Sequence, residues 1–143
     1  MSVFTSAELE YLLSQRLGRL ATVDAAGTLH VVPVGYRYNS EADAIDLGGT
    51  AFGRSKKYRD AARHGQVAFV VDDVPAPGRQ RGVEIRGVVE VFTTGGDVAI
   101  RPGADPEFIR IAPRHIASWG LDTSPFEPRG RDVPETARPQ AGR

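Results

Sequence analysis

Apolar positions near the start of the chain follow a helical period. Leu9, Leu12 and Leu13 recur at the spacing of one helix face. Thr5 and Glu8 precede them at the spacing of a capping box, in which each residue satisfies a backbone amide of the first turn. The pattern therefore predicts a short N-terminal helix that ends near Gly18.

The period then changes to that of β-strands. Residues 17–23 and 29–38 flank the turn Asp24-Ala25-Ala26-Gly27 and predict a β-hairpin. Pro33 has no amide hydrogen to donate, so it indicates an edge or a bulge in the second strand. Ser55 is expected to cap a second short helix that reaches Arg63. Further strands are predicted at 44–47, 66–72, 83–92 and 108–119, the last of them interrupted at Pro113.

These elements amount to six short strands and two short helices, with antiparallel hairpins predominating. Such an arrangement favours a mainly β fold, a small antiparallel barrel, over a doubly wound parallel sheet. We assign residues 1–121 to one domain. Residues 122–143 contain several Pro and Arg residues and almost no large apolar side chains, so they are expected to form a tail that is mobile or laid over a neighbour.

Composition excludes several classes of function. The 143 residues include 18 basic and 18 acidic side chains, a balance that does not favour binding to nucleic acid or to a membrane surface. The absence of Cys excludes thiolate catalysis, disulfides and Cys-based metal sites. His30, His64 and His115 are not at a metal-ligand spacing, so no metal is expected. We find no signal peptide and no long apolar run, which predicts a cytoplasmic protein.

The glycine-rich segment 48–55 is the strongest candidate for chemistry. Its spacing is that of a phosphate-binding P-loop, but Arg54 stands where nucleotide hydrolases need a lysine. A weaker interpretation remains, in which the loop, the helix cap at Ser55 and the cations Arg54, Lys56 and Lys57 hold a phosphate. The alternative is a glycine-rich turn followed by a capped helix. Lys56 and Lys57 are the two lysines of the chain.

No acid–base pair, nucleophile or metal site is recognisable in the sequence. The protein is therefore either not an enzyme or one whose cofactor carries the chemistry, as a flavin or deazaflavin does in hydride transfer. No catalytic side chain is identified. Tyr36 or a bound water is a candidate proton donor.

The order of the segments resembles the pyridoxamine 5′-phosphate oxidase-like split-barrel superfamily. Within it, the chain resembles the flavin- and deazaflavin-dependent oxidoreductases, and in particular the actinobacterial branch that depends on coenzyme F420. The resemblance covers residues 12–121. It rests on Gly18-Arg19-Leu20-Ala21-Thr22-Val23, Val31-Val32-Pro33-Val34-Gly35-Tyr36, Ser55-Lys56-Lys57-Tyr58-Arg59-Asp60, Gly82-Val83-Glu84-Ile85-Arg86-Gly87 and Ile116-Ala117-Ser118-Trp119-Gly120-Leu121.

The resemblance implies a fold, an assembly and a site. The fold would be the six-stranded antiparallel split β-barrel of flavin-binding proteins, with Greek-key topology, assembled as a homodimer with a cofactor at the interface. Ser55 and Lys57 match the positions that hold the cofactor phosphate, and Arg54 and Lys56 are their neighbours. The residues expected along the ring system are Val32, Pro33, Val34, Gly49 and Thr50. Asp60 departs from the Asn common at its position, and would have to point to Arg59 or Arg63.

The activity implied is reduction of a small unsaturated or quinone-like acceptor by hydride from reduced F420. The Arg- and Ala-rich composition suggests an actinobacterial source and favours F420 over FMN. An FMN-dependent oxidoreductase of the same fold is an alternative, and so is a carrier that binds F420 or FMN without turnover. A pyridoxamine phosphate oxidase proper fits less well, because the chain is short and lacks a second basic cluster for the substrate phosphate.

Overall fold

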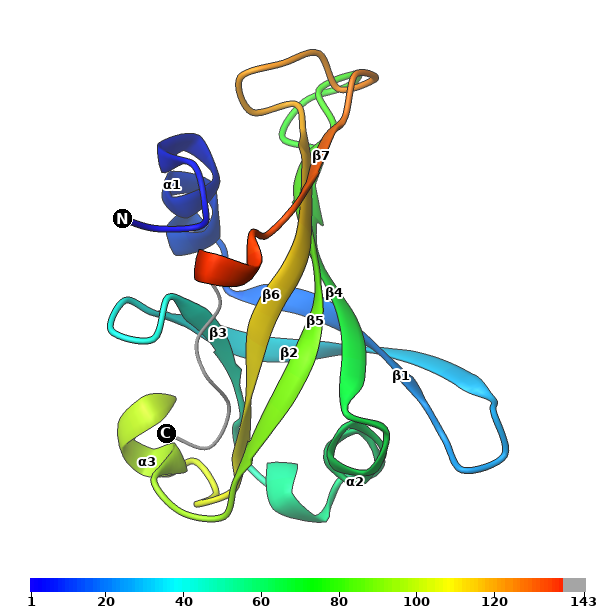
Figure 1. Ribbon diagram of the computed structural model, residues 1–143, viewed down its shortest axis with the longest axis vertical. Helices are drawn as coiled ribbons and strands as arrows, with labels where there is room; N and C mark the ends of the chain where they lie inside the picture. Colours follow the sequence, from blue (N-terminus) through cyan, green and yellow to red (C-terminus); the bar gives the residue numbers. More distant parts are fainter. Residues whose placement is uncertain (138–143) are drawn as a thin grey trace.

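Seven antiparallel strands form one sheet in the computed structural model, which describes residues 1–137 (Figure 1). The strands follow the order β3-β2-β1-β4-β5-β6-β7, and β3 also pairs with β6. That pairing closes six strands into a barrel and leaves β7 outside it, so the expected six-stranded antiparallel barrel is confirmed. The strands are β1 (Leu17–Val23), β2 (Leu29–Asn39), β3 (Ala44–Leu47), β4 (Gln66–Asp73), β5 (Arg81–Phe92), β6 (Phe108–Trp119) and β7 (Arg129–Asp132).

The barrel interior is filled by the apolar positions that alternate along the strands. In β4, Val67, Phe69 and Val71 point inward, and Val83 and Ile85 do so in β5. Burial of such side chains is the main favourable term in folding. The largest apolar side chains that are almost completely buried are Leu12, Leu20, Ile45, Leu47, Phe69, Ile85, Ile109, Ile111 and Ile116.

Helix α1 (Ser6–Ser14) begins with the predicted capping box. The Thr5 hydroxyl accepts a hydrogen bond from the Glu8 amide, and the Glu8 carboxylate accepts one from the Thr5 amide. Tyr11 and Leu12 pack into the barrel core. In Figure 1, α1 lies beside β7, and an ion pair from Arg131 to the buried Glu8 joins the two elements.

Two further helices lie toward the opposite end of the molecule (Figure 1). Helix α2 (Lys56–His64) follows a 3₁₀ turn, η1 (Phe52–Arg54). The four-residue α3 (Gly96–Ala99) was not expected, because its segment is short and glycine-rich. A small separate cluster that includes Ile100, Ala104 and Phe108 holds the segment after α3 against the barrel, with the Phe92 ring stacked on Phe108. None of the helices formed by residues 1–137 is long and apolar enough to cross a membrane.

Both prolines within strands sit where the ladder tolerates a missing donor. Pro33 pairs with Arg19 of β1, but β3 pairs only with residues 36–39 of β2, so Pro33 lies at an edge as predicted. Pro113 does not interrupt β6. Instead, the register shifts there, since Arg86 pairs with His115 and Gly87 with Pro113, and this leaves a bulge that keeps the strand continuous.

The expected tail contributes a strand and a 3₁₀ turn, η2 (Glu135–Ala137). Residues 129–132 pair with residues 115–118 of β6. This strand carries no apolar alternation, and it is held by the β6 ladder and by the contact between Arg131 and Glu8. Residues 129–132 therefore extend the sheet, while residues 138–143 of the predicted tail lie outside the described part of the chain.

Candidate functional site

The loop after β3 has an unusual backbone at two residues. Gly49 has φ of 147°, a value that side-chain-bearing residues rarely adopt, and Ala51 lies in the left-handed region with φ of 61°. Ser55 then caps α2, because its hydroxyl accepts a hydrogen bond from the Tyr58 amide at 3.3 Å and donates one to the Phe52 carbonyl at 2.6 Å. The predicted helix start at Ser55 is confirmed.

A carboxylate from a distant segment fixes this loop. Asp105 accepts hydrogen bonds from the amides of Ala51 and Gly53 at 3.0 and 3.1 Å. Its own amide donates to the Gly49 carbonyl at 3.0 Å. These two loop amides are therefore occupied by Asp105, so they are not offered to a phosphate as a P-loop backbone would be. Sequence reasoning missed Asp105 because more than fifty residues separate it from the loop.

A cavity of about 660 Å³ opens between this loop and β2. Five of the residues expected at the cofactor line it: Pro33, Val34, Gly49, Thr50 and Lys57. The same wall contains Arg16, Gly35, Tyr36, Arg37, Gly48, Phe52, Ile100 and Arg101. The structure thus brings together most of the ring-side residues and one of the two lysines, in a single cavity.

Four expected residues lie outside the lining of this cavity: Val32, Arg54, Ser55 and Lys56. The Ser55 hydroxyl is used in the helix cap, and Arg54 is exposed. Lys56 turns to the other side of α2, where its Nζ lies 3.0 Å from an Asp60 carboxylate oxygen and 3.7 Å from Asp24. The adjacent lysines therefore have different surroundings.

Asp60 is compensated by a different residue from the two that were expected. It is buried and pairs with Lys56. Arg59 donates instead to the Arg54 carbonyl, and Arg63 to the carbonyl of Val23. The i,i+4 spacing places Lys56 one turn before Asp60 on the same helix face, which explains the pairing. The Asp60 carboxylate is thereby removed from the cavity wall.

The cavity is strongly basic. Lys57, Arg16, Arg37 and Arg101 line it, and none of the four forms an ion pair with another residue in the range 1–137. No acidic side chain belongs to the described lining. Unpaired cations around a concave surface attract anionic ligands, because little of their field is neutralised locally.

The sequence pattern predicts the position of one cavity arginine, Arg37, but not that of another, Arg101. Arg37 lies two and four residues after Gly35 and Pro33, so strand alternation places all three on the outer face of β2. Arg101 follows α3, and its Nη2 donates to the Thr50 hydroxyl at 2.9 Å. No local pattern signals Arg101, since only the fold brings it to Thr50.

Tyr36 is not placed as a proton donor. Its hydroxyl donates to the Leu12 carbonyl at 2.6 Å in the barrel interior. Burial raises the pKa of this phenol above its usual value of 10. The hydroxyl is thus already engaged and holds its proton tightly, which leaves the phenol without a free hydrogen to deliver to a ligand.

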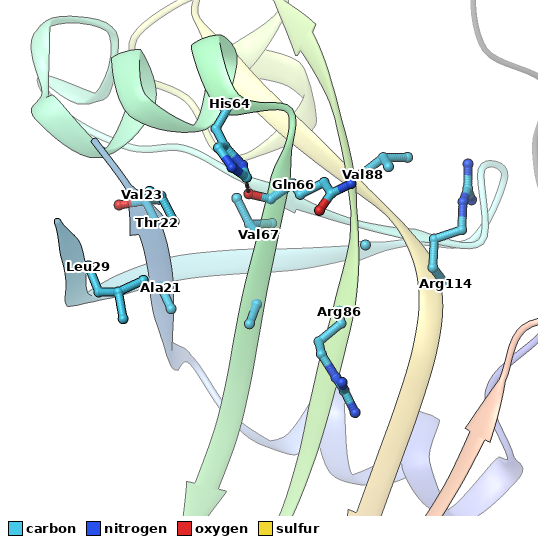
Figure 2. A pocket seen from close by; sticks show the side chains of 12 residues that line it. Ala21, Thr22, Val23, Leu29, His64, Gln66, Val67, Arg86, Val88 and Arg114 are labelled. Atoms are coloured by element: carbon cyan, nitrogen blue, oxygen red, sulfur yellow. Dashed lines mark hydrogen bonds between the residues drawn. The ribbon is translucent and has the colours of Figure 1, made fainter. Parts of the chain in front are cut away.

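A second cavity, of about 410 Å³, lies on the outer face of the sheet (Figure 2). Its floor is mostly apolar and comes from β1, β2, β4 and β5, with Ala21, Val23, Leu29 and Val88 among its residues. Figure 2 also shows His64 beside it, with the ring donating to the Gln66 carbonyl at 3.2 Å. No residue predicted to bind the cofactor lies in this cavity. Across residues 1–137, no three His, Asp or Glu side chains are grouped as a metal site.

Comparison with known proteins finds similarity over the whole barrel. Residues 4–120 match the family model described as pyridoxamine 5′-phosphate oxidase. A Streptomyces rimosus protein named 5a,11a-dehydrotetracycline/5a,11a-dehydrooxytetracycline reductase is 46% identical over 121 residues, which are 83% of this chain and 84% of that protein.

Solved structures support the same fold at lower identity. An FAD-binding protein from Mycobacterium smegmatis has a TM-score of 0.60 at 22% identity, over 81% of this chain and 93% of its own. An FAD-binding protein from Mesorhizobium loti has a TM-score of 0.58 at 23% identity, over 80% and 92%. With the family match spanning nearly the whole barrel, these likenesses agree with the observed strand order: the chain belongs to the pyridoxamine 5′-phosphate oxidase family.

Proposed function

We propose that this protein is a reductase that transfers hydride from reduced coenzyme F420 to a carbon–carbon double bond of an unsaturated, polycyclic acceptor. The reductase name of the 46% identical relative supports both the reaction and the acceptor class, since its dehydro substrates are named for missing hydrogens. The observation that carries the proposal is the basic cavity beside β2, which suits an anionic cofactor.

Open space along the cavity wall, as well as its charge, supports this proposal. At Gly35 and Gly49 an added Cβ would meet no atom within 4 Å, so both glycines leave open space in the wall. The four cations and the missing carboxylates favour a phosphate-bearing ligand. We assign the phosphate to Lys57, and the ring system to the surface of Pro33, Val34, Gly49 and Thr50.

The chain's own residues bind and orient in this account. When bound, the reduced deazaflavin supplies a hydride, and the acceptor double bond takes that hydride and one proton. The Asp105 carboxylate keeps the loop from Gly49 to Gly53 in one conformation, which presents a fixed wall to the ring. Since the Tyr36 hydroxyl is engaged with Leu12, we assign the proton to water reaching the open cavity.

We also propose that the protein acts as a homodimer through the outer face of β1 and β2. Leu29 and Val31 are 77% and 67% exposed on this face, and Leu17 is 58% exposed. The apolar cavity of Figure 2 adjoins them, so a second copy would cover a continuous apolar surface. A Val31→Asp substitution is expected to give a monomer in light scattering, and an unchanged dimer would place the interface elsewhere.

FMN remains the alternative cofactor, and the two structural neighbours named as FAD-binding proteins support a flavin-type cofactor. A carrier without turnover is the alternative function, and the absence of an assigned acid–base group in the cavity motivates it. Separate titrations of the purified protein with F420 and with FMN, followed by cofactor fluorescence, distinguish these possibilities. Tight binding of F420 and weak binding of FMN is the expected result, and the reverse preference would assign the protein to FMN chemistry.

A further inference from the structure

The segment after α3 supplies a wall of the cavity that the family motifs do not include. Arg101 lines the cavity and donates to the Thr50 hydroxyl at 2.9 Å. Arg37 also lines the cavity, and its Nη1 donates to the Ile100 carbonyl at 3.2 Å. The Arg37 guanidinium is thus bonded to the turn that carries Arg101, and the Arg101 guanidinium is bonded to the loop that carries Thr50.

This turn is firmly anchored to the barrel. Ile100 and Ala104 are buried against Phe108. Asp105, at the end of the turn, bonds through its carboxylate and its amide to the loop that carries Thr50. The base of Arg101 is therefore held in place, so less of its conformational freedom remains to be lost when an anion binds.

The charge of the cavity exceeds what one phosphate neutralises. A phosphate monoester carries at most two negative charges near neutral pH. Two of the four cations suffice to balance such a group, and Arg37 and Arg101 have no acidic partner among residues 1–137. By contrast, Arg19, Arg81 and Arg110 on other surfaces pair with aspartates.

We infer that Arg101, together with Arg37, forms a second anion subsite in the cofactor cavity. The inference rests on the proposed function, since it concerns the same cavity. It predicts preference for a cofactor that carries a second anionic group beyond a single phosphate. Two cofactor types supply such a group, F420 through the carboxylates of its tail and FAD through its second phosphate.

The test compares Arg101→Ala with a matched loss of charge elsewhere. Arg79 is exposed on the loop between β4 and β5, outside the cavity, so Arg79→Ala removes the same charge without touching the subsite. Calorimetric titrations use four ligands with a flavin or deazaflavin ring system: F420, FAD, FMN and riboflavin. Thermal unfolding of each variant is recorded alongside.

Arg101→Ala is expected to weaken F420 or FAD about tenfold, as for loss of a charge-assisted hydrogen bond, while FMN changes less than twofold. Arg79→Ala is expected to leave the affinities for F420, FAD and FMN unchanged. If Arg101→Ala weakens the binding of F420 alone, the subsite holds the carboxylates of the F420 tail. If it weakens the binding of FAD alone, the subsite holds the second phosphate of FAD. Equal weakening of FMN, or no weakening of any ligand, overturns the subsite while leaving the proposed function intact. Failure of the unaltered protein to bind all four overturns both.

Discussion

Lys57 and Lys56 allow one decisive comparison because neighbouring lysines face different surroundings. Lys57 lines the basic cavity, where its Nζ lies 5.7 Å from the centre of the Phe52 ring. Lys56 pairs with Asp60 and Asp24 on the other side of the helix. Replacing either lysine by Ala removes one positive charge and the same side-chain atoms. We predict that the two variants differ strongly in cofactor affinity.

The magnitude follows from the contact each lysine makes. A charge-assisted hydrogen bond to a phosphate contributes roughly 1.5–3 kcal/mol, which corresponds to about a 10- to 150-fold change in Kd. Lys57→Ala is expected to fall in that range. Its contact with the Phe52 ring is half-exposed, so the same change should lower the free energy of unfolding by less than about 1 kcal/mol. Lys56 acts on the cofactor only through longer, solvent-screened distances, so its loss should cost less than about threefold.

The assay is titration of each variant with F420 by fluorescence, at one fixed ionic strength, with urea unfolding of the same samples. Unchanged affinity in Lys57→Ala would move the phosphate to another part of the molecule. Equal losses in the two variants would also refute the reasoning, since they would reflect net charge and not position.

Three further predictions concern stability and cavity shape. Arg131→Ala should lower the free energy of unfolding by about 2–4 kcal/mol, because it leaves the buried Glu8 carboxylate unpaired, while the exposed Arg129→Ala should change it little in urea unfolding. Burial acts to raise the pKa of Glu8, but bonds from Arg131, the Thr5 amide and Ser118 bring it below the usual 4.5. The carboxylate therefore contributes stability above about pH 4.5 that is lost as pH falls through the lowered pKa, and Glu8→Gln should flatten the acid side of the stability profile; an unchanged profile would contradict this. Gly35→Leu should leave the melting temperature nearly unchanged, since no protein atom lies near its Cβ, yet block cofactor binding; retained affinity would show that the ring lies elsewhere.

The barrel could be predicted from sequence because its core residues alternate along short strands. In β4, and in β5 as far as Gly87, the positions that repeat every second residue are the ones that point inward, whereas Val91 near the end of β5 is exposed. The capping residues Thr5 and Ser55 act within a few residues of themselves, so their helix starts were also visible. Such signals are local, and local signals can be found in one sequence.

Features that depend on distant contacts were not visible. Strand β7 has the composition of a turn, and it forms because Arg131 meets Glu8 across the fold and the β6 edge offers a ladder. Asp105 and Arg101 reach the loop after β3 only when the segment following α3 folds back onto it. Likewise, the different roles of Lys56 and Lys57 depend on which face of α2 meets the cavity. Two adjacent lysines in the sequence do not show which of them lies on that face.

Hydride transfer itself is the central claim, and single-turnover kinetics test it most directly. Protein loaded with reduced F420 is mixed rapidly with a dehydrotetracycline-type enone, and the return of oxidised F420 is followed by absorbance. The account predicts oxidation that is much faster than that of free reduced F420 under the same conditions, and slowed in Lys57→Ala at subsaturating cofactor. Oxidation no faster than that of the free cofactor, for this enone and for a panel of quinones, would contradict the account and leave a cofactor carrier.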